Sequence, residues 1–132
     1  MTFVWLHLDV ILAIHEAQLS EHGGRQGIRD VALLKSALAR PQQRITYGDP
    51  RPDTIELAAT YAIAILQNHP FIDGNKRTAF VALVTFLRLN GYELQADDAS
   101  CVLAFLDLAT ETSAEADFIA FIRNNTMQRG GQ

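Results

Sequence analysis

Apolar residues recur at helical spacing along most of this chain. Between residues 9 and 21, Val10, Ile11 and Ile14 fall on one face of a helix, and glycines at 23 and 24 end it. The same spacing continues, with short polar interruptions, to residue 123. The predicted helices cover residues 9–21, 31–39, 54–68, 76–90, 99–109 and 114–123. The pattern predicts an all-α fold.

Short polar side chains mark the starts of these helices, because their oxygens can accept hydrogen bonds from the unpaired backbone N–H groups of a first turn. The predicted capping residues are Asp30, Asp53 with Glu56, Asp97 or Asp98, and Thr112 with Glu115. Proline removes a backbone donor and glycine favours a helix C-terminus. We therefore expect Pro41 to end the second helix and Gly91 to end the fourth.

Three segments fall outside the helical pattern. Residues 3–6 are the first candidate for a strand. Residues 42–52 contain one glycine and two prolines, which predicts a loop or a short hairpin. The tail, residues 124–132, is polar and contains glycine, so we expect it to fray. No repeat or linker divides the chain, and residues 1–132 are predicted to form a single domain.

Composition argues against a nucleic-acid-binding, disulfide-bonded or membrane-spanning protein. The chain has 132 residues, of which 48% are hydrophobic and 20% charged, and its net charge of −4 argues against direct binding of nucleic acid. A single cysteine, Cys101, excludes an intrachain disulfide. No apolar run approaches the roughly 20 residues that span a bilayer, and the N-terminus does not resemble a signal peptide. We expect a cytoplasmic protein without membrane contact.

The helix predicted at 76–90 is apolar around much of its circumference, which is typical of a central buried helix. Residues 69–78, immediately before and within its first turn, combine an imidazole, a carboxylate, a glycine, an amide and two adjacent cations. The N-terminus of a helix offers unpaired N–H groups and the positive end of a dipole, which together bind anions. This segment therefore predicts a site that handles phosphate.

Each polar residue of the segment has a candidate role. His69 is the candidate general base, because imidazole accepts a proton near neutral pH. Asp73 is the candidate ligand for Mg²⁺, which binds one or two carboxylates together with phosphate oxygens. The predicted nucleotide- or phosphate-binding residues are Gly74, Asn75, Lys76 and Arg77. Asn75 is also expected to cap the helix.

Simpler readings exist for the same residues. Asp-Gly-Asn is an ordinary turn sequence, and the two cations could be solvated. However, cations in a first helical turn oppose the helix dipole by about 0.3–1 kcal/mol each, so a sequence selected for stability alone would place Asp or Glu there. A binding module that holds an anion without chemistry remains an alternative to an enzyme.

The motif His-Pro-Phe-Ile-Asp-Gly-Asn-Lys-Arg-Thr, residues 69–78, resembles the signature of the Fic/Doc family, and specifically of its death-on-curing (Doc) toxin branch. The broader Fic pattern has glycine where this chain has Lys76 and a further arginine where it has Phe80. Both departures resemble the Doc branch. The likeness extends over about residues 3–122.

This resemblance implies a Fic-like helical bundle around a central buried helix, with a flap at residues 42–52. It implies a toxin of a toxin–antitoxin module that uses ATP and Mg²⁺ to phosphorylate a protein hydroxyl, by resemblance a threonine of translation elongation factor Tu, and so inhibits translation. No internal inhibitory helix is evident, which implies inhibition in trans by an antitoxin. Transfer of AMP, as in most Fic proteins, would use the same residues and stays open.

Residues outside the motif rank lower as candidates. His7, His15 and His22 are not spaced as an i, i+4 metal pair. Arg29 is expected to be a structural or surface charge that pairs locally with Asp30.

Overall fold

The computed structural model describes residues 2–110 and 114–129, and within these ranges the chain is mostly helical. The six helices are α1 (Leu8–His22), α2 (Val31–Tyr47), α3 (Thr54–Asn68), α4 (Asn75–Leu89), α5 (Asp98–Ala109) and α6 (Glu115–Asn124). Two short strands, β1 (Tyr92–Leu94) and β2 (Thr126–Gln128), pair antiparallel. The predicted all-α class is confirmed.

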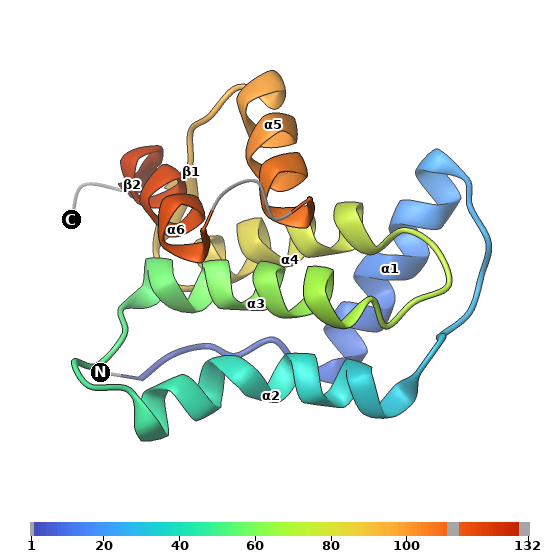
Figure 1. Cartoon of the computed structure of the whole chain (residues 1–132), viewed down its shortest axis with the longest axis horizontal. Helices are drawn as coiled ribbons and strands as arrows, with labels where there is room; N and C mark the ends of the chain where they lie inside the picture. Colours follow the sequence, from blue (N-terminus) through green and yellow to red (C-terminus); the bar gives the residue numbers. More distant parts are fainter. Residues whose placement is uncertain (1, 111–113, 130–132) are drawn as a thin grey trace.

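Helices α3 and α4 run side by side through the middle of the molecule (Figure 1). Helix α2 packs against α3 on one side and α1 crosses α4, while α5 and α6 cover the opposite side of the pair. Between Thr54 and Ile65, every residue of α3 except Glu56 is buried. The predicted central helix is therefore present as α4, but α3 shares the centre of the bundle and is the more completely buried of the two.

The expectation that Pro41 ends the second helix is wrong. Helix α2 continues through Pro41, which is buried, to Tyr47. The last turns of α2 are anchored by Arg44, whose guanidinium donates to the Thr60 hydroxyl at 3.1 Å and to the Glu56 carboxylate at 3.2 Å, both on α3. Tertiary contacts here compensate for the hydrogen bond that proline removes.

The predicted hairpin or flap at residues 42–52 is also wrong in its larger part. Residues 42–47 are the end of α2, and only the connection from Gly48 to Asp53 is non-helical. Residues 3–6, the other strand candidate, lie outside any strand. The backbone N–H and carbonyl of Val4 bond instead to the side-chain amide of Asn90, at 2.8 and 3.0 Å.

The prediction of a frayed tail fails for residues 126–128, which form β2 and align Thr126 with Leu94 and Gln128 with Tyr92 of β1. Residues 130–132 lie outside the described part of the chain. The predicted capping box at Thr112 also lies outside it, and α6 begins at Glu115.

No helix in the described ranges combines the length and apolarity needed to cross a membrane.

Candidate active site

The predicted motif occupies the turn between the two central helices. Helix α3 ends at Asn68, and His69 follows in the left-handed conformation, with φ 49° and ψ 55°. The N–H of His69 still donates to the Ile65 carbonyl at 2.9 Å, so the residue terminates the helix while its side chain is exposed to solvent. The imidazole is therefore exposed at the end of a buried helix, where a substrate can reach it.

Gly74 begins the second half of the site. It is the N-cap of α4, with φ 78° and ψ 16° in the left-handed region that favours glycine. A Cβ at this position would come within 3.3 Å of Leu19 and 3.6 Å of the His15 ring. The positive φ favours glycine here, and the close neighbours on α1 add a steric reason for it.

The first turn of α4 presents unpaired donors together with positive charge. No side chain caps the helix and no acidic residue lies in its first turn, while Lys76 and Arg77 are exposed. The first backbone bond after the cap runs from Thr78 N–H to the Gly74 carbonyl, which leaves the earlier N–H groups outside the helical hydrogen-bond pattern. Backbone donors, helix dipole and two cations therefore favour an anion at this end of α4.

The cations also border a pocket of about 570 Å³ between α1, α4 and α5. Its lining is mixed, with Phe80 and Phe105 among the apolar side chains and Gln18 among the polar ones. This volume lies in the range of about 300–1,000 Å³ that is typical of small-molecule sites. The anion site thus adjoins a space large enough for an organic ligand.

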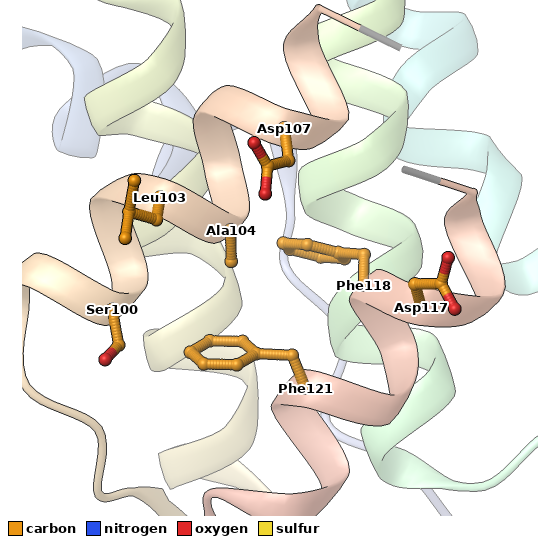
Figure 2. Close-up of a pocket in the computed structure, with 7 residues that line it drawn as sticks. All are labelled: Ser100, Leu103, Ala104, Asp107, Asp117, Phe118 and Phe121. Atoms are coloured by element: carbon orange, nitrogen blue, oxygen red, sulfur yellow. The ribbon is translucent and has the colours of Figure 1, made fainter. Parts of the chain in front are cut away.

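A second, smaller pocket of about 280 Å³ lies between α5 and α6 (Figure 2). Asp107 points toward the ring of Phe118 there, and Phe121 lies on the other side of the opening. None of the residues that line it belongs to the motif. We assign the candidate active site to the motif loop and its adjoining pocket.

Asp73 is held by backbone donors on both carboxylate oxygens. Its Oδ1 accepts from Gly74 N–H at 2.9 Å and its Oδ2 from Arg25 N–H at 3.1 Å. The Arg25 bond, followed by the Gly74 bond and the positive charges of Arg25 and Arg77, lowers the pKa of this carboxyl below its ordinary value. Asp73 is therefore ionised at neutral pH, which is the form that a metal ligand requires.

The surroundings of Asp73 fit a magnesium ion that is also bound by phosphate. The carboxylate is exposed, and each oxygen retains a lone pair beyond the one that accepts the backbone bond. Within the described ranges, no group of three or more His, Cys, Asp or Glu side chains could enclose a metal. One carboxylate with phosphate oxygens and water is a usual ligand set for Mg²⁺.

Asn75 does not cap α4, so this part of the prediction is wrong. Its side chain is buried and bonds twice to the backbone of Phe71: its Oδ1 accepts from the N–H at 3.0 Å, and its Nδ2 donates to the carbonyl at 2.9 Å. The amide thereby closes the loop on itself. Only the backbone N–H of Asn75, in the first turn of α4, is placed to contribute to a phosphate site.

His15, which the sequence ranked low as a candidate site residue, contacts the motif loop from α1. It is 6% exposed, its ring stacks on that of Phe71 with centroids 3.8 Å apart, and its Nε2 lies 2.8 Å from the Asp73 carbonyl oxygen. Because a carbonyl only accepts, Nε2 carries the hydrogen. The signal in the sequence was that His15 stands four residues after Ile11, on the buried face of α1.

The segment between α1 and α2 runs antiparallel to the motif loop. Ile28 and Phe71 form an isolated bridge, and Ile72 N–H donates to the Gly27 carbonyl at 3.1 Å.

The side chains of Arg29 and Asp30 do not form the predicted local pair. Asp30 caps α2 by accepting from Leu33 N–H at 2.9 Å, whereas the guanidinium of Arg29 reaches the end of α3.

The helical bundle and the loop define a class of protein: a mostly helical fold with a candidate anion site at the start of a central helix. A sequence model of the Fic/DOC family matches residues 5–87, which include the whole motif. The chain belongs to this family.

Two curated relatives carry Doc in their names. "Protein kinase doc" of Escherichia phage P1 is 37% identical over 86 residues, 65% of this chain and 68% of the relative. "Toxin Doc" of Mycolicibacterium smegmatis is 44% identical over 75 residues, 57% of this chain and 58% of the relative. The match thus spans less than two thirds of the mycobacterial protein's length. The predicted resemblance to the Doc branch is confirmed.

Proposed function

We propose that this chain is a Doc-like toxin that transfers the γ-phosphate of ATP to a hydroxyl group of a target protein. The observation that carries the proposal is the arrangement of the motif loop. It places an exposed imidazole at one end and, at the other, an uncapped helix N-terminus with two exposed cations. Phosphoryl transfer depends mainly on positioning and on stabilisation of negative charge, and both are provided by such a loop.

His69 is the proposed general base. It takes the proton of the target hydroxyl as that oxygen forms a bond to the γ-phosphorus. The bond from the γ-phosphorus to the bridging oxygen breaks, and its electron pair stays on the departing ADP. The N–H groups of the first turn of α4, with Lys76 and Arg77, stabilise the charge on the transferred phosphate.

Asp73 is the proposed holder of Mg²⁺ on the phosphate oxygens, because its carboxylate is ionised and exposed. When bound, the ion would supply additional neutralisation of phosphate charge. The backbone N–H groups of Arg25 and Gly74 each donate to one oxygen of this carboxylate and so orient it beside the start of α4.

The choice of phosphate rather than AMP is supported by Lys76 and by the relative from phage P1, which is named a protein kinase. The broader Fic pattern has glycine where Lys76 stands, so the lysine adds both charge and volume beside the bound phosphates. By resemblance to the Doc branch, the proposed target is a threonine of elongation factor Tu, the proposed consequence is inhibition of translation in the cytoplasm, and the proposed partner is an antitoxin that inhibits in trans.

The position of a radioactive label tests this proposal. The protein is incubated with Mg²⁺, a bacterial lysate and ATP labelled at either the α- or the γ-phosphate. We expect label on a protein from γ-labelled ATP alone, and on purified elongation factor Tu when it replaces the lysate. Label from α-labelled ATP would make the chain an AMP transferase instead. Label from neither would support a non-enzymatic anion-binding module.

A further inference from the structure

His69 adopts a backbone conformation that needs support. Within residues 2–110 and 114–129 it is the only residue other than glycine with a positive φ. The left-handed region costs about 1–2 kcal/mol for a residue with a Cβ. A following proline restricts the backbone of the residue before it, and Pro70 follows here. Such a conformation persists only where the surrounding contacts determine it.

Arg29 makes the contacts that accompany this conformation. Its Nε donates to the His69 carbonyl at 2.7 Å, and its Nη2 donates to the Asn68 carbonyl at 2.9 Å. Its own backbone N–H donates to the Pro70 carbonyl at 2.7 Å. One residue therefore binds three consecutive carbonyl groups across the point where α3 turns into the motif loop.

The chemistry of the guanidinium suits this place. Its N–H groups lie in a fixed plane, so two of them can reach adjacent carbonyls at once, which the ammonium group of a lysine cannot reproduce. The last turn of α3 contains no basic residue of its own. Arg29 thus supplies, from another segment, the positive charge that stabilises the C-terminal end of a helix.

We propose that Arg29 is a positioning residue for His69. It holds the backbone of His69 in the left-handed conformation and so directs the imidazole toward the substrate, without contacting the substrate itself. The catalytic part of this inference rests on the proposed function, whereas the conformational part does not. Nothing in the motif itself supplies these bonds, because the donors come from the segment between α1 and α2.

Arg40 offers a matched control. It is also an arginine outside the motif whose guanidinium reaches the end of α3, where it donates to Gln67 Oε1 at 2.7 Å and to Asn68 Oδ1 at 3.5 Å. Both acceptors are side chains, so loss of Arg40 leaves the carbonyl of His69 bonded to Arg29. A general effect on the end of α3 would appear in variants of both Arg29 and Arg40. An effect specific to His69 would appear only in variants of Arg29.

The conformational part is tested by NMR on R29Q, R29K and R40Q in the full chain, each first shown to be folded by thermal unfolding. The three-bond coupling between the amide and α protons and the carbon shifts of His69 report its φ. We expect His69 to leave the left-handed region in R29Q and R29K but to keep it in R40Q. A left-handed His69 in R29Q, or in R29K where R29Q does not fold, would overturn the proposal.

The catalytic part is tested by the rate of phosphate transfer. We expect kcat to fall roughly 10²-fold in R29Q, as displacement of a catalytic group commonly produces, with ATP affinity unchanged. The kcat of R29K should fall by nearly as much, and R40Q should retain the wild-type kcat. In the H69A background, R29Q should cause no further loss, because Arg29 acts through His69.

The results separate this inference from the proposed function. An additional loss in the double variant, or equal losses in R29Q and R40Q, would overturn the positioning role while transfer by the wild type upheld the proposed function. If the wild type transfers no phosphate, or if H69A is fully active, the proposed function fails. The NMR result still decides in that case whether Arg29 fixes the conformation of His69.

Discussion

The imidazole of His15 lies flat on the ring of Phe71, with an angle of 8° between the ring planes and 3.8 Å between the centroids. The same imidazole donates to the carbonyl of Asp73. A residue of the first helix thus contacts the loop at two points, one apolar and one polar. The site is fixed from outside the motif as well as by the motif's own residues.

Replacement of His15 by Phe separates these two contacts. H15F keeps a ring that can stack on Phe71 but removes the donor to the Asp73 carbonyl. We expect the free energy of unfolding to fall by about 1 kcal/mol, the usual net value of such a hydrogen bond, and transfer to require more Mg²⁺. Urea unfolding and a Mg²⁺ titration measure both effects, with the exposed neighbour variant E16Q as control. Unchanged stability would show that the polar contact contributes nothing.

Replacement of Asp73 by Asn tests the proposed metal ligand. D73N removes the anionic charge, so we expect phosphate transfer to need a higher Mg²⁺ concentration and to be partly restored by it. Because the pKa of Asp73 is lowered, its carboxylate should stay ionised, and able to bind the metal, to a lower pH than an ordinary aspartate. The same Mg²⁺ requirement in D73N and wild type would leave Asp73 with a structural role alone.

Replacement of Lys76 by Gly restores the broader Fic pattern. We expect K76G to transfer γ-phosphate at a rate reduced by roughly 10²–10³-fold, the usual effect of removing one stabilising group from a transition state. Lys76 is exposed, so the fold should be unaffected. Mass spectrometry of the target reports whether phosphate or AMP has been added. Phosphate addition at the wild-type rate would exclude Lys76 from both charge stabilisation and selection of the transferred group.

The ion pair between α3 and α6 predicts a dependence of stability on pH. Arg123 Nη1 lies 2.6 Å from Asp53 Oδ2. Partial burial raises the pKa of Asp53, but the Arg123 guanidinium and the Glu56 N–H together bring it below the ordinary value of 3.8. A lowered pKa stabilises the folded state above the unfolded pKa, and this contribution is lost as the pH falls through the folded pKa.

D53N tests this dependence while keeping a capping oxygen for Glu56 N–H. We expect D53N to be less stable than the wild type by about 0.2–1 kcal/mol at pH 7, because both partners are half exposed. The difference should disappear below the folded pKa of Asp53. Urea unfolding over a pH series measures it, and a difference that persists in acid would have another cause.

Local features of the fold were predictable because they depend on neighbouring residues. The expected caps Asp30, Asp53 and Asp97 each accept a hydrogen bond from the backbone N–H three residues later. The motif turn was predictable for the same reason, since its glycine and its cations are adjacent in the chain. Hydrogen bonds between residues within one helical turn of each other can be predicted from the local sequence.

The errors arose where distant residues decide the outcome. Pro41 stays helical because Arg44 is tied to α3, and residues 126–128 form a strand because β1 pairs with them. Asn75 is an exception, because its partner Phe71 is only four residues away: two local bonding modes competed, and the amide bonds to the Phe71 backbone instead of capping α4. His15 and Arg29 could not be assigned to the site from sequence because their partners lie 39 or more residues away.

His69 is proposed to take the proton from the attacking hydroxyl of a protein target. The most direct measurement compares transfer of γ-phosphate by wild type and H69A, with ATP affinity and thermal unfolding measured in parallel. Because a general base contributes little to ground-state binding, we expect transfer to fall by roughly 10²–10⁴-fold while affinity and stability stay unchanged. Transfer by H69A at the wild-type rate would exclude His69 as the general base.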